Sequence, residues 1–569
     1  MKKVITVAAI AAVVLIAIFF LTNYNADQSA NQESDNQSEK SNQAAKEDDE
    51  EAEPEYKYPP EKAQNLLDQQ KELESEILSE SEGSTLDEPY VNLDPYDRSP
   101  LAALVIFDTE EAAKVSFTVK GKDEETDISK TFADYKTHHE LPVLGLYPDY
   151  DNKVEITAET ESGETLEKTL TISTDELPNY IPDINIKTAD LGKMDISANE
   201  LTFAIPSTKF VYGFDINGDI RWYGSGYNSH VLQELNNGRL LYLGKDDNSG
   251  SAYNRLFETD YLGKLYNAFK ISEEAAQAES EGMESTLIHH DIAELPSGNL
   301  ILTVNDGRGE YMEDMMIEID RETGDVVKQI DLKDLFTKEQ YEEHDSTEPK
   351  DGLTDWFHQN SVVYDKSDDS IIISGRNSDT VMKIDYETEE IKWMLAYPEG
   401  WDKDMQEYLI DGQGEDFKYP AGQHDANILP DFDDNPDTLD LLLYDNNTVI
   451  TRGDEALSKQ FSAATHYRIN EKTKEAEIIW TYGEERGEDY FTNIIGSARY
   501  LEDTGNVLID FGHVDKGNQS NIVEVTHHQD DDVVFEAEIT DFPKGAWVYR
   551  GVRRALYTNT WENDFSLTE

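Results

Sequence analysis

The chain has no cysteine among its 569 residues. This absence excludes disulfide bonds, thiolate metal sites, cysteine nucleophiles and a lipid anchor on cysteine. Basic residues are also scarce, because 48 Lys and Arg stand against 120 Asp and Glu and give a formal net charge of −72. A chain with this charge repels polyanions, so we expect no nucleic-acid partner. The acidic excess is typical of a strongly solvated surface.

One long apolar run is present, at the N-terminus. Val4 to Leu21 is uncharged, and its length is close to the roughly 20 residues that span a bilayer. Lys2 and Lys3 precede it, which by the positive-inside rule places the N-terminus in the cytoplasm. No small-x-small cleavage site follows, so residues 1–22 are predicted to be a membrane anchor rather than a removed signal sequence. The expected location is the cell membrane, with a single span and the folded body on the extracytoplasmic side.

Two segments separate this run from the first predicted strands. Residues 23–60 are rich in Asn, Gln, Ser, Glu and Asp and cannot bury enough apolar surface to fold, which predicts a disordered acidic tether. Residues 61–90 begin with EKAQNLLDQQKELESEIL, where leucines and charges recur at helical spacing. They are predicted to form an amphipathic helix and a linker.

A change of hydrophobic period follows. Within residues 91–185, short alternating segments such as KVSFTVKG and KVEITAET are separated by polar turns. This pattern predicts a small antiparallel Ig-like β-sandwich with a structural role.

Residues 186–569 contain a repeat, which is the strongest structural signal in the sequence. Each copy has an apolar segment, a polar turn and a second apolar segment, as a β-hairpin requires. The six copies begin at Phe210, Arg255, Met316, Val381, His466 and Ile522. Six such units predict a six-bladed β-propeller, because closure of the ring removes exposed sheet edges. The expected fold class is therefore all-β, a propeller preceded by the sandwich, with an N-terminal transmembrane helix.

A histidine precedes four of these hairpins at the same spacing. It lies five positions before an apolar residue that leads into a turn; the pairs are His230 with Leu235, His290 with Leu295, His358 with Val363, and His424 with Leu429. Equivalent positions in successive blades lie at the same height around the axis of a propeller. We therefore expect the four imidazoles to converge on one site.

Two further side chains are expected near the histidines. Asn360 lies two residues after His358, on the same face of an extended strand. Arg376 ends the strand IIISGR, and a hairpin would return its guanidinium toward the same site. Imidazoles together with an arginine suit a tetrahedral anionic group.

The runs HHD at 289–291, DWFHQNSVVYDKSDDSIIISGR and GQHDANILP resemble signature segments of the bacterial PAPS-independent arylsulfate sulfotransferases. The resemblance covers the chain from about Leu101 to the C-terminus. It implies transfer of a sulfuryl group from an aryl sulfate ester to a phenol through a sulfated histidine, with no cofactor and no metal. Residue by residue, it makes His424 the nucleophile and residues 186–569 the catalytic domain. It assigns the sulfate-holding groups to His290, His358, Asn360 and Arg376.

The resemblance leaves several assignments open. The hydroxyl-bearing residue of the family site is either Thr492 or Ser497, and His289 is an alternative to His290. His230 fits the ring and is counted among the substrate-binding candidates, although no family role transfers to it. Either His358 or His290 is the general acid and base. Whether the chain forms a homodimer is not readable from the sequence.

Two other functions fit the same pattern. The first is a metal-dependent propeller lyase, in which the histidines bind a divalent cation. Arg376 argues against it, because a guanidinium repels a nearby cation. The second is a non-catalytic binding propeller at the cell surface, for which His424 would be dispensable.

Overall fold

The computed structural model describes residues 59–245, 254–270, 288–305, 311–342, 354–528, 531–557 and 565–568. The predicted anchor, residues 1–22, lies outside the described residues, and so does the predicted tether up to residue 58. Among the described residues, no helix combines the length and apolar character needed to cross a membrane.

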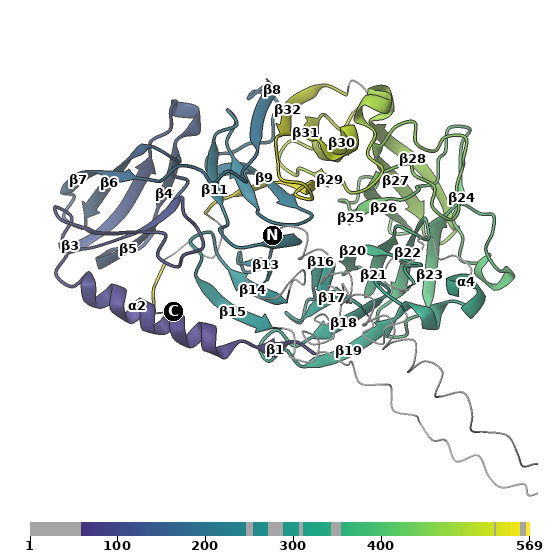
Figure 1. Cartoon of the computed structure of the whole chain (residues 1–569), viewed down its shortest axis with the longest axis horizontal. Coiled ribbons are helices and arrows are strands. Elements are labelled where there is room, and N and C mark those ends of the chain that lie inside the picture. The colour runs from purple at the N-terminus through teal and green to yellow at the C-terminus, as the bar shows by residue number, and fades with distance from the viewer. Residues whose placement is uncertain are drawn as a thin grey trace, which may run out of the picture. The chain divides into compact units, whose positions relative to one another are not determined.

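The first long element is a helix, α2 (Gln64–Glu80), which packs along the strand β15 (Leu265–Lys270) (Figure 1). Gln70 anchors it, because its side-chain amide donates to Leu265 O at 2.9 Å and accepts from Leu265 N at 2.8 Å. Ahead of the helix, the short strand β1 (Glu61–Lys62) pairs with the edge of β15.

A separate β-structure follows between residues 90 and 173. Its strands are β2 (Tyr90–Leu93), β3 (Ala102–Val119), β4 (Ile128–Thr131), β5 (Lys136–Leu144), β6 (Asp151–Thr160) and β7 (Thr165–Ser173), with the 3-10 turn η1 (Glu124–Thr126). The long strand β3 changes partners along its length: it pairs first with β2 and β5, then with β4 and β6. Its second half alternates buried and half-buried residues, as a strand with one face on a core does.

The rest of the described chain forms six sheets, each with four antiparallel strands at its centre. In five sheets these four strands follow one another in sequence. In the sixth, a strand near the C-terminus pairs with the first of three consecutive earlier strands. Three of them are β12 (Asn228–Glu234), β13 (Leu240–Gly244), β14 (Arg255–Thr259) and β15; β16 (Ile288–Glu294), β17 (Leu300–Val304), β18 (Met315–Ile319) and β19 (Val326–Asp331); and β20 (Gln359–Asp365), β21 (Ser370–Gly375), β22 (Thr380–Asp385) and β23 (Ile391–Ala396). The all-β prediction is confirmed.

The other three sheets complete the set. They are β25 (His424–Ile428), β26 (Thr438–Asp445), β27 (Ala463–Asn470) and β28 (Glu475–Tyr482); β29 (Ser497–Tyr500), β30 (Val507–Val514), β31 (Gln519–Val525) and β32 (Val533–Thr540); and β33 (Val548–Ala555), β9 (Glu200–Pro206), β10 (Tyr212–Phe214) and β11 (Ile220–Tyr223). Edge strands β8 (Asp183–Ala189) and β24 (Asp411–Gly412) extend two of them. The short helices are α4 (Lys338–Glu342), η2 (Leu332–Leu335), η3 (Lys403–Met405), η4 (Glu484–Tyr490) and η5 (Asp515–Gly517).

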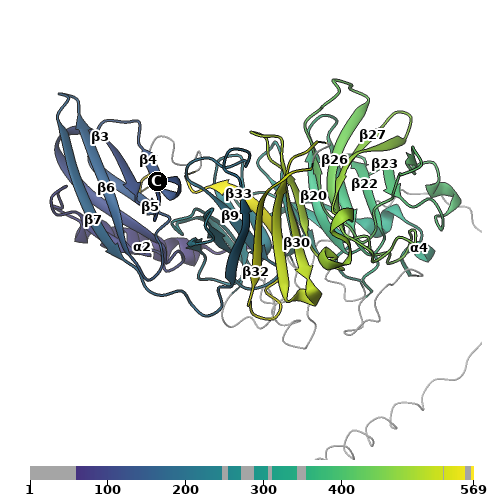
Figure 2. The same cartoon turned by 90° about the horizontal axis from the view of Figure 1, so that it is seen from above.

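The last described strand pairs with a strand from the beginning of the six-sheet region. β33 lies beside β9 in the sixth sheet, so residues about 350 positions apart in sequence share one hydrogen-bonded ladder (Figure 2). The first strand of each sheet also packs against the first strand of the next, from β12 through β16, β20, β25 and β29 to β33.

One side chain at the start of a strand accepts a hydrogen bond from the backbone of the following sheet. The pairs are Asp291 with Val362 N at 3.0 Å, Ser361 with Ala426 N at 3.2 Å, Asp425 with Ala498 N at 3.1 Å, and Ser497 with Gly551 N at 3.1 Å. These bonds fix neighbouring sheets to one another where their first strands begin. The histidines lie at the same level.

Candidate active site

Three of the four predicted histidines have the same unusual backbone conformation. His230, His290 and His358 lie in the left-handed region, with φ of 57°, 40° and 55°. In the fourth sheet the left-handed residue is Asp425, at φ 56°, rather than His424. The common register that the sequence predicts is therefore wrong for His424 by one residue. The pairing of β25 with β26 shifts register between His424 and Asn427, which accommodates this one-residue offset.

The four imidazoles nevertheless lie in one place. The ring centroids of His230 and His290 are 4.6 Å apart, and those of His290 and His358 are 4.8 Å apart. The ring of Tyr549, on β33, contacts three of them, at 4.3 Å from His230, 5.8 Å from His290 and 6.0 Å from His424. The expected convergence is thus observed, with a tyrosine at its centre that the sequence analysis did not single out.

Arg550 holds the backbone beneath the histidines. Its guanidinium donates to the carbonyl oxygens of His230 at 3.2 Å and His290 at 3.0 Å, and to that of Asn360 at 3.4 Å. Asp291 and Asp425 balance its charge at 3.2 Å and 3.1 Å. One buried side chain therefore positions the strands of three sheets. The sequence analysis missed it, although WVYRGVRRAL is a cluster of arginines in a very acidic chain.

His424 is fully enclosed, and its protonated nitrogen can be assigned. Nδ1 lies 2.7 Å from Asn446 Oδ1 and 3.1 Å from Gly422 O. The Asn446 amide nitrogen donates to Thr492 O at 3.0 Å and to Ile495 O at 2.9 Å, and carbonyls only accept. Asn446 must therefore present its oxygen to His424, whose Nδ1 carries the proton. Nε2 is left with a free lone pair.

Burial, and then the charge of Arg376, hold the pKa of His424 well below its usual range. The ring is therefore a neutral imidazole at ordinary pH. Burial and Arg550 likewise lower the pKa of His230 to about 3.

The other predicted polar residues surround this ring. Asn360 donates to Gln423 O at 2.6 Å, just before His424. Arg376 is half-buried and donates to Asn377 Oδ1 at 2.7 Å and Asn493 O at 3.4 Å. Burial lowers the pKa of Arg376.

The two hydroxyl candidates have different surroundings. Thr492 Oγ1 lies 2.7 Å from Tyr444 OH and accepts from the Asn446 amide at 3.2 Å, so it is one residue removed from His424. Ser497 Oγ accepts from Gly551 N and joins two sheets. Among the described contacts of Ser497, none reaches the histidines.

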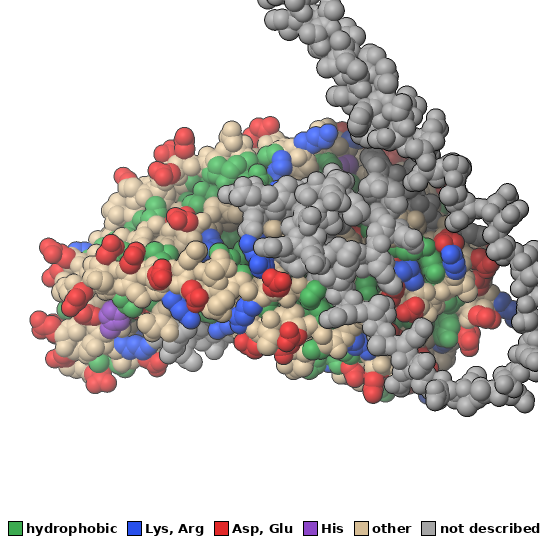
Figure 3. All heavy atoms as spheres, turned by 60° about the horizontal axis from the view of Figure 1, so that its bottom comes forward, with side chains coloured by type: hydrophobic (Ala, Val, Ile, Leu, Met, Phe, Trp, Pro, Cys, Tyr) green, Lys and Arg blue, Asp and Glu red, His purple; other side chains and the backbone are tan. Residues whose placement is uncertain are grey.

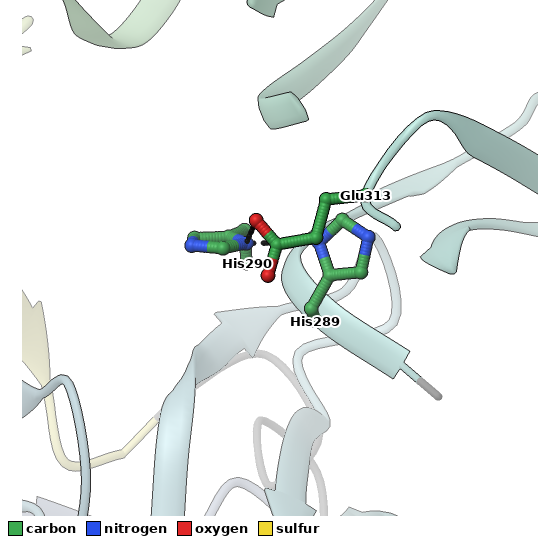
Figure 4. Close-up of side chains that lie close together, drawn as sticks. All are labelled: His289, His290 and Glu313. Carbon is green, nitrogen blue, oxygen red and sulfur yellow. Dashed lines mark hydrogen bonds and ion pairs between the residues drawn. The ribbon is translucent and has the colours of Figure 1, made fainter. Parts of the chain in front are cut away.

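Two carboxylates that the sequence analysis did not single out, those of Glu313 and Asp355, lie beside His358. Its Nδ1 is 2.6 Å from Glu313 Oε2 and 2.8 Å from Asp355 Oδ2. Burial opposes protonation of His358, but Asp355 and Glu313 outweigh it and raise the pKa to about 10. His289 Nδ1 lies 2.8 Å from His290 Nδ1, and His290 Nδ1 is 3.8 Å from Glu313 Oε2 (Figure 4). His289 is thus a partner of His290 rather than its replacement.

The chain matches family models over most of its length. Residues 167–550 match the model described as "Arylsulfotransferase (ASST)", and residues 90–175 match "Arylsulfotransferase Ig-like domain", which confirms the predicted Ig-like domain. The arylsulfate sulfotransferase AssT of Escherichia coli O6:H1 is 25% identical over 74% of this chain and 84% of that protein. The protein of the same name from Lelliottia amnigena is 24% identical over 73% and 83%.

Solved structures with lower similarity were also found. A 6-phosphogluconolactonase described as putative from Bacteroides fragilis covers 78% of this chain and 99% of its own, at 10% identity and a TM-score of 0.33. The periplasmic gluconolactonase of Pseudomonas aeruginosa covers 79% and 100%, at 9% identity and a TM-score of 0.31.

Proposed function

Because the chain belongs to the arylsulfotransferase family, we propose that it transfers a sulfuryl group from an aryl sulfate ester to a phenolic acceptor. The family resemblance that the sequence motifs indicate is confirmed, and the chain is an enzyme of the arylsulfate sulfotransferase type. The proposal goes further in three respects: the sulfuryl group passes through a sulfated histidine, that histidine is His424, and no PAPS takes part.

In the first step, the Nε2 lone pair of His424 forms a bond to sulfur while the bond from sulfur to the aryl oxygen breaks. The leaving phenolate takes up a proton from a neighbouring donor. In the second step, the phenol acceptor gives its proton to the group that protonated the phenolate, its oxygen attacks sulfur, and the bond from nitrogen to sulfur breaks. The histidine returns to its neutral form, and no nucleotide donor is consumed.

The observation that carries this proposal is the contact between His424 and Asn446. Asn446 Oδ1 accepts the Nδ1 proton at 2.7 Å, and its amide nitrogen is held by two carbonyls. The lone pair is therefore on Nε2 before any substrate binds. Burial keeps the ring uncharged, as a nucleophile at an anionic centre requires.

The neighbouring groups are assigned to the sulfate oxygens. His290, His358, Asn360 and Arg376 would donate hydrogen bonds as negative charge moves toward the leaving oxygen. Thr492 is preferred to Ser497 as the hydroxyl-bearing residue, because it contacts Asn446. His230, whose ring lies against His290, completes the wall.

We further propose that the six sheets close into a six-bladed propeller. Two features support it: the β33 to β9 pairing joins the two ends of the repeat, and the first strands pack in sequence from β12 to β33. The location at the cell membrane, through residues 1–22 with the catalytic domain outside, is kept as a proposal that rests on Lys2, Lys3 and the apolar run.

The decisive experiment uses the full chain with p-nitrophenyl sulfate, with and without a phenol acceptor, and with no PAPS. We expect nitrophenol release to depend on the acceptor, and a brief incubation with donor alone to leave one SO₃ group on His424, detected by mass spectrometry of peptides. His424→Ala should abolish both signals. His527→Ala should retain them, because His527 lies between β31 and β32 and contacts His466 outside the site. Full transfer by His424→Ala, or a strict need for PAPS, would refute the mechanism.

A further inference from the structure

The geometry points to a divalent cation site beside the sulfuryl site: we propose that His289, His290 and Glu313 bind a transition-metal dication of the Zn²⁺ or Mn²⁺ class, with Asp355 and His358 completing the ligand set. The proposed transfer reaction needs no metal, so the two proposals stand or fall separately.

The ligand atoms already converge. One nitrogen each of His289 and His290 and one oxygen of Glu313 lie within 4.8 Å of one another, and so do ligand atoms of Glu313, Asp355 and His358. Glu313 belongs to both groups, so the proposed cation is placed next to its carboxylate. His289 and His290 come from the start of β16, and Glu313 lies just before β18 (Figure 4).

The facing nitrogen and oxygen atoms of this cluster have more lone pairs than protons. Nδ1 of His289 faces Nδ1 of His290 at 2.8 Å, and two imidazole nitrogens share at most one proton in such a pair. Nδ1 of His358 faces two carboxylates at once, at 2.6 Å and 2.8 Å. One proton on His358 Nδ1 serves both carboxylates, and one proton serves the pair of His289 and His290. A cation that displaces these two protons would accept all of the lone pairs that face them.

One buried atom left without a partner supports the same conclusion. Within the described residues, no hydrogen bond reaches Asp355 Oδ1, although this atom is inaccessible to solvent. Glu313 and Asp355 are themselves only 8% and 7% exposed. Buried carboxylate oxygens without donors are costly unless a charge balances them.

The charge of the site gives a second reason. A site for a sulfate ester must attract an anion, yet the two carboxylates beside His358 offset the positive charges of His358 and Arg376. A dication would restore a positive potential there. A histidine that ligates through Nδ1 also carries its proton on Nε2, so His290 and His358 could bind the cation and still donate to sulfate oxygens.

The donor set selects the metal class. Imidazole nitrogen with carboxylate oxygen suits Zn²⁺ or Mn²⁺, whereas Ca²⁺ and Mg²⁺ prefer oxygen ligands. A guanidinium repels a nearby cation, but that of Arg376 donates to Asn377 and Asn493 rather than to Glu313.

The test measures metal directly. The full chain, purified without a polyhistidine tag and stripped with chelator, is dialysed against Zn²⁺ or Mn²⁺ and analysed by elemental mass spectrometry and titration calorimetry. We expect close to one tightly bound ion and a higher melting temperature with metal than without. His289→Ala and Glu313→Gln should weaken binding by about 100-fold or more, beyond the loss caused by removing outer partners.

A matched control comes from a second histidine and carboxylate cluster. His466 lies 3.2 Å from His527 and 2.9 Å from Asp440, outside the site. His527→Ala should bind the ion as the unchanged chain does. Circular dichroism before metal addition identifies variants that fail to fold. If His289→Ala fails to fold, the metal affinity of the milder Glu313→Gln decides the outcome. Absence of stoichiometric metal in the unchanged chain, or its retention by both site variants, would overturn the proposal. Failure of sulfuryl transfer alone would not.

Discussion

Asn446 determines which nitrogen of His424 carries the proton and which keeps its lone pair. Its amide nitrogen has two carbonyl partners, so the side chain cannot rotate to offer a donor to the histidine without losing both. The neighbouring Gly422 reinforces this arrangement. It adopts φ of +63°, and a Cβ there would lie 2.7 Å from Thr448 O. Glycine is therefore required where the chain turns into the histidine.

Asn446→Leu should lower kcat by about 10- to 100-fold with a smaller effect on KM, because it removes the acceptor that orients the nucleophile. Steady-state kinetics with p-nitrophenyl sulfate measures this split. Thr448→Val is the matched control, since it removes only a hydroxyl that donates to Asn446 O at 3.3 Å and leaves the Asn446 side chain its bonds to Thr492 O and Ile495 O. Equal losses of kcat in the two variants would show that Asn446 has no special role.

The pH dependence of kcat/KM follows from the lowered pKa of His424. The folded pKa lies below the usual 6.5, so the reactive neutral ring persists as the pH falls through 6.5 and is lost only at lower pH. The acidic limb of the profile should therefore lie below pH 6.5. Arg376→Leu removes a repelling cation, so it should move that limb upward even though it also lowers the maximal rate. A limb at or above pH 6.5 in the unchanged chain would contradict this assignment.

At the scale of elements, the first strand of each sheet has two roles. These strands begin at the candidate site, and they join the sheets through Asp291, Ser361, Asp425 and Ser497. Ser497 is thus better explained as a link between β29 and β33 than as a substrate ligand. The last strand, β33, supplies both Tyr549 and Arg550 to the site.

Arg550→Met should reduce the free energy of unfolding by about 3–5 kcal/mol, because it removes the cation paired with buried Asp291 and leaves Asp425 with Arg499 alone. Urea unfolding followed by fluorescence measures the change. Lys472→Met is the control: its ion pair with Asp437 has side chains 73% and 46% exposed, so its loss should cost less than about 1 kcal/mol. A similar small effect for both variants would show that Arg550 does not hold β33 to its neighbours.

For the whole molecule, the net charge of −72 is the dominant electrostatic fact. Figure 3 shows acidic side chains spread over the described part of one face, with fewer basic ones among them. Like charges at this density repel one another in the compact state.

The melting temperature should therefore rise as NaCl is raised from about 0.01 M to about 1 M, because the screening length falls from about 30 Å to about 3 Å. Differential scanning calorimetry measures the trend, and KCl should reproduce it if general screening is the cause. A melting temperature that stays constant or falls over this range would refute self-repulsion as a major term.

The repeat and the histidine spacing were sufficient to predict an all-β chain and the gathering of His230, His290, His358 and His424. Alternating strands and turn residues are local features, and a histidine at a repeated position must lie at a repeated place. The sequence motifs were also sufficient to identify the family. The one-residue shift of His424 was not predictable, since it depends on how each strand bends as it enters its sheet.

What the sequence alone determined is the period of the strands, the acidic charge and the residue types at the repeated positions, because each of these is written within a short stretch of chain. Only the tertiary structure decided that Asn446 orients His424, that Arg550 joins three sheets, and that Glu313 and Asp355 meet His289, His290 and His358. These contacts join residues far apart in sequence, and loop geometry, which has no periodic signal, sets where each side chain arrives.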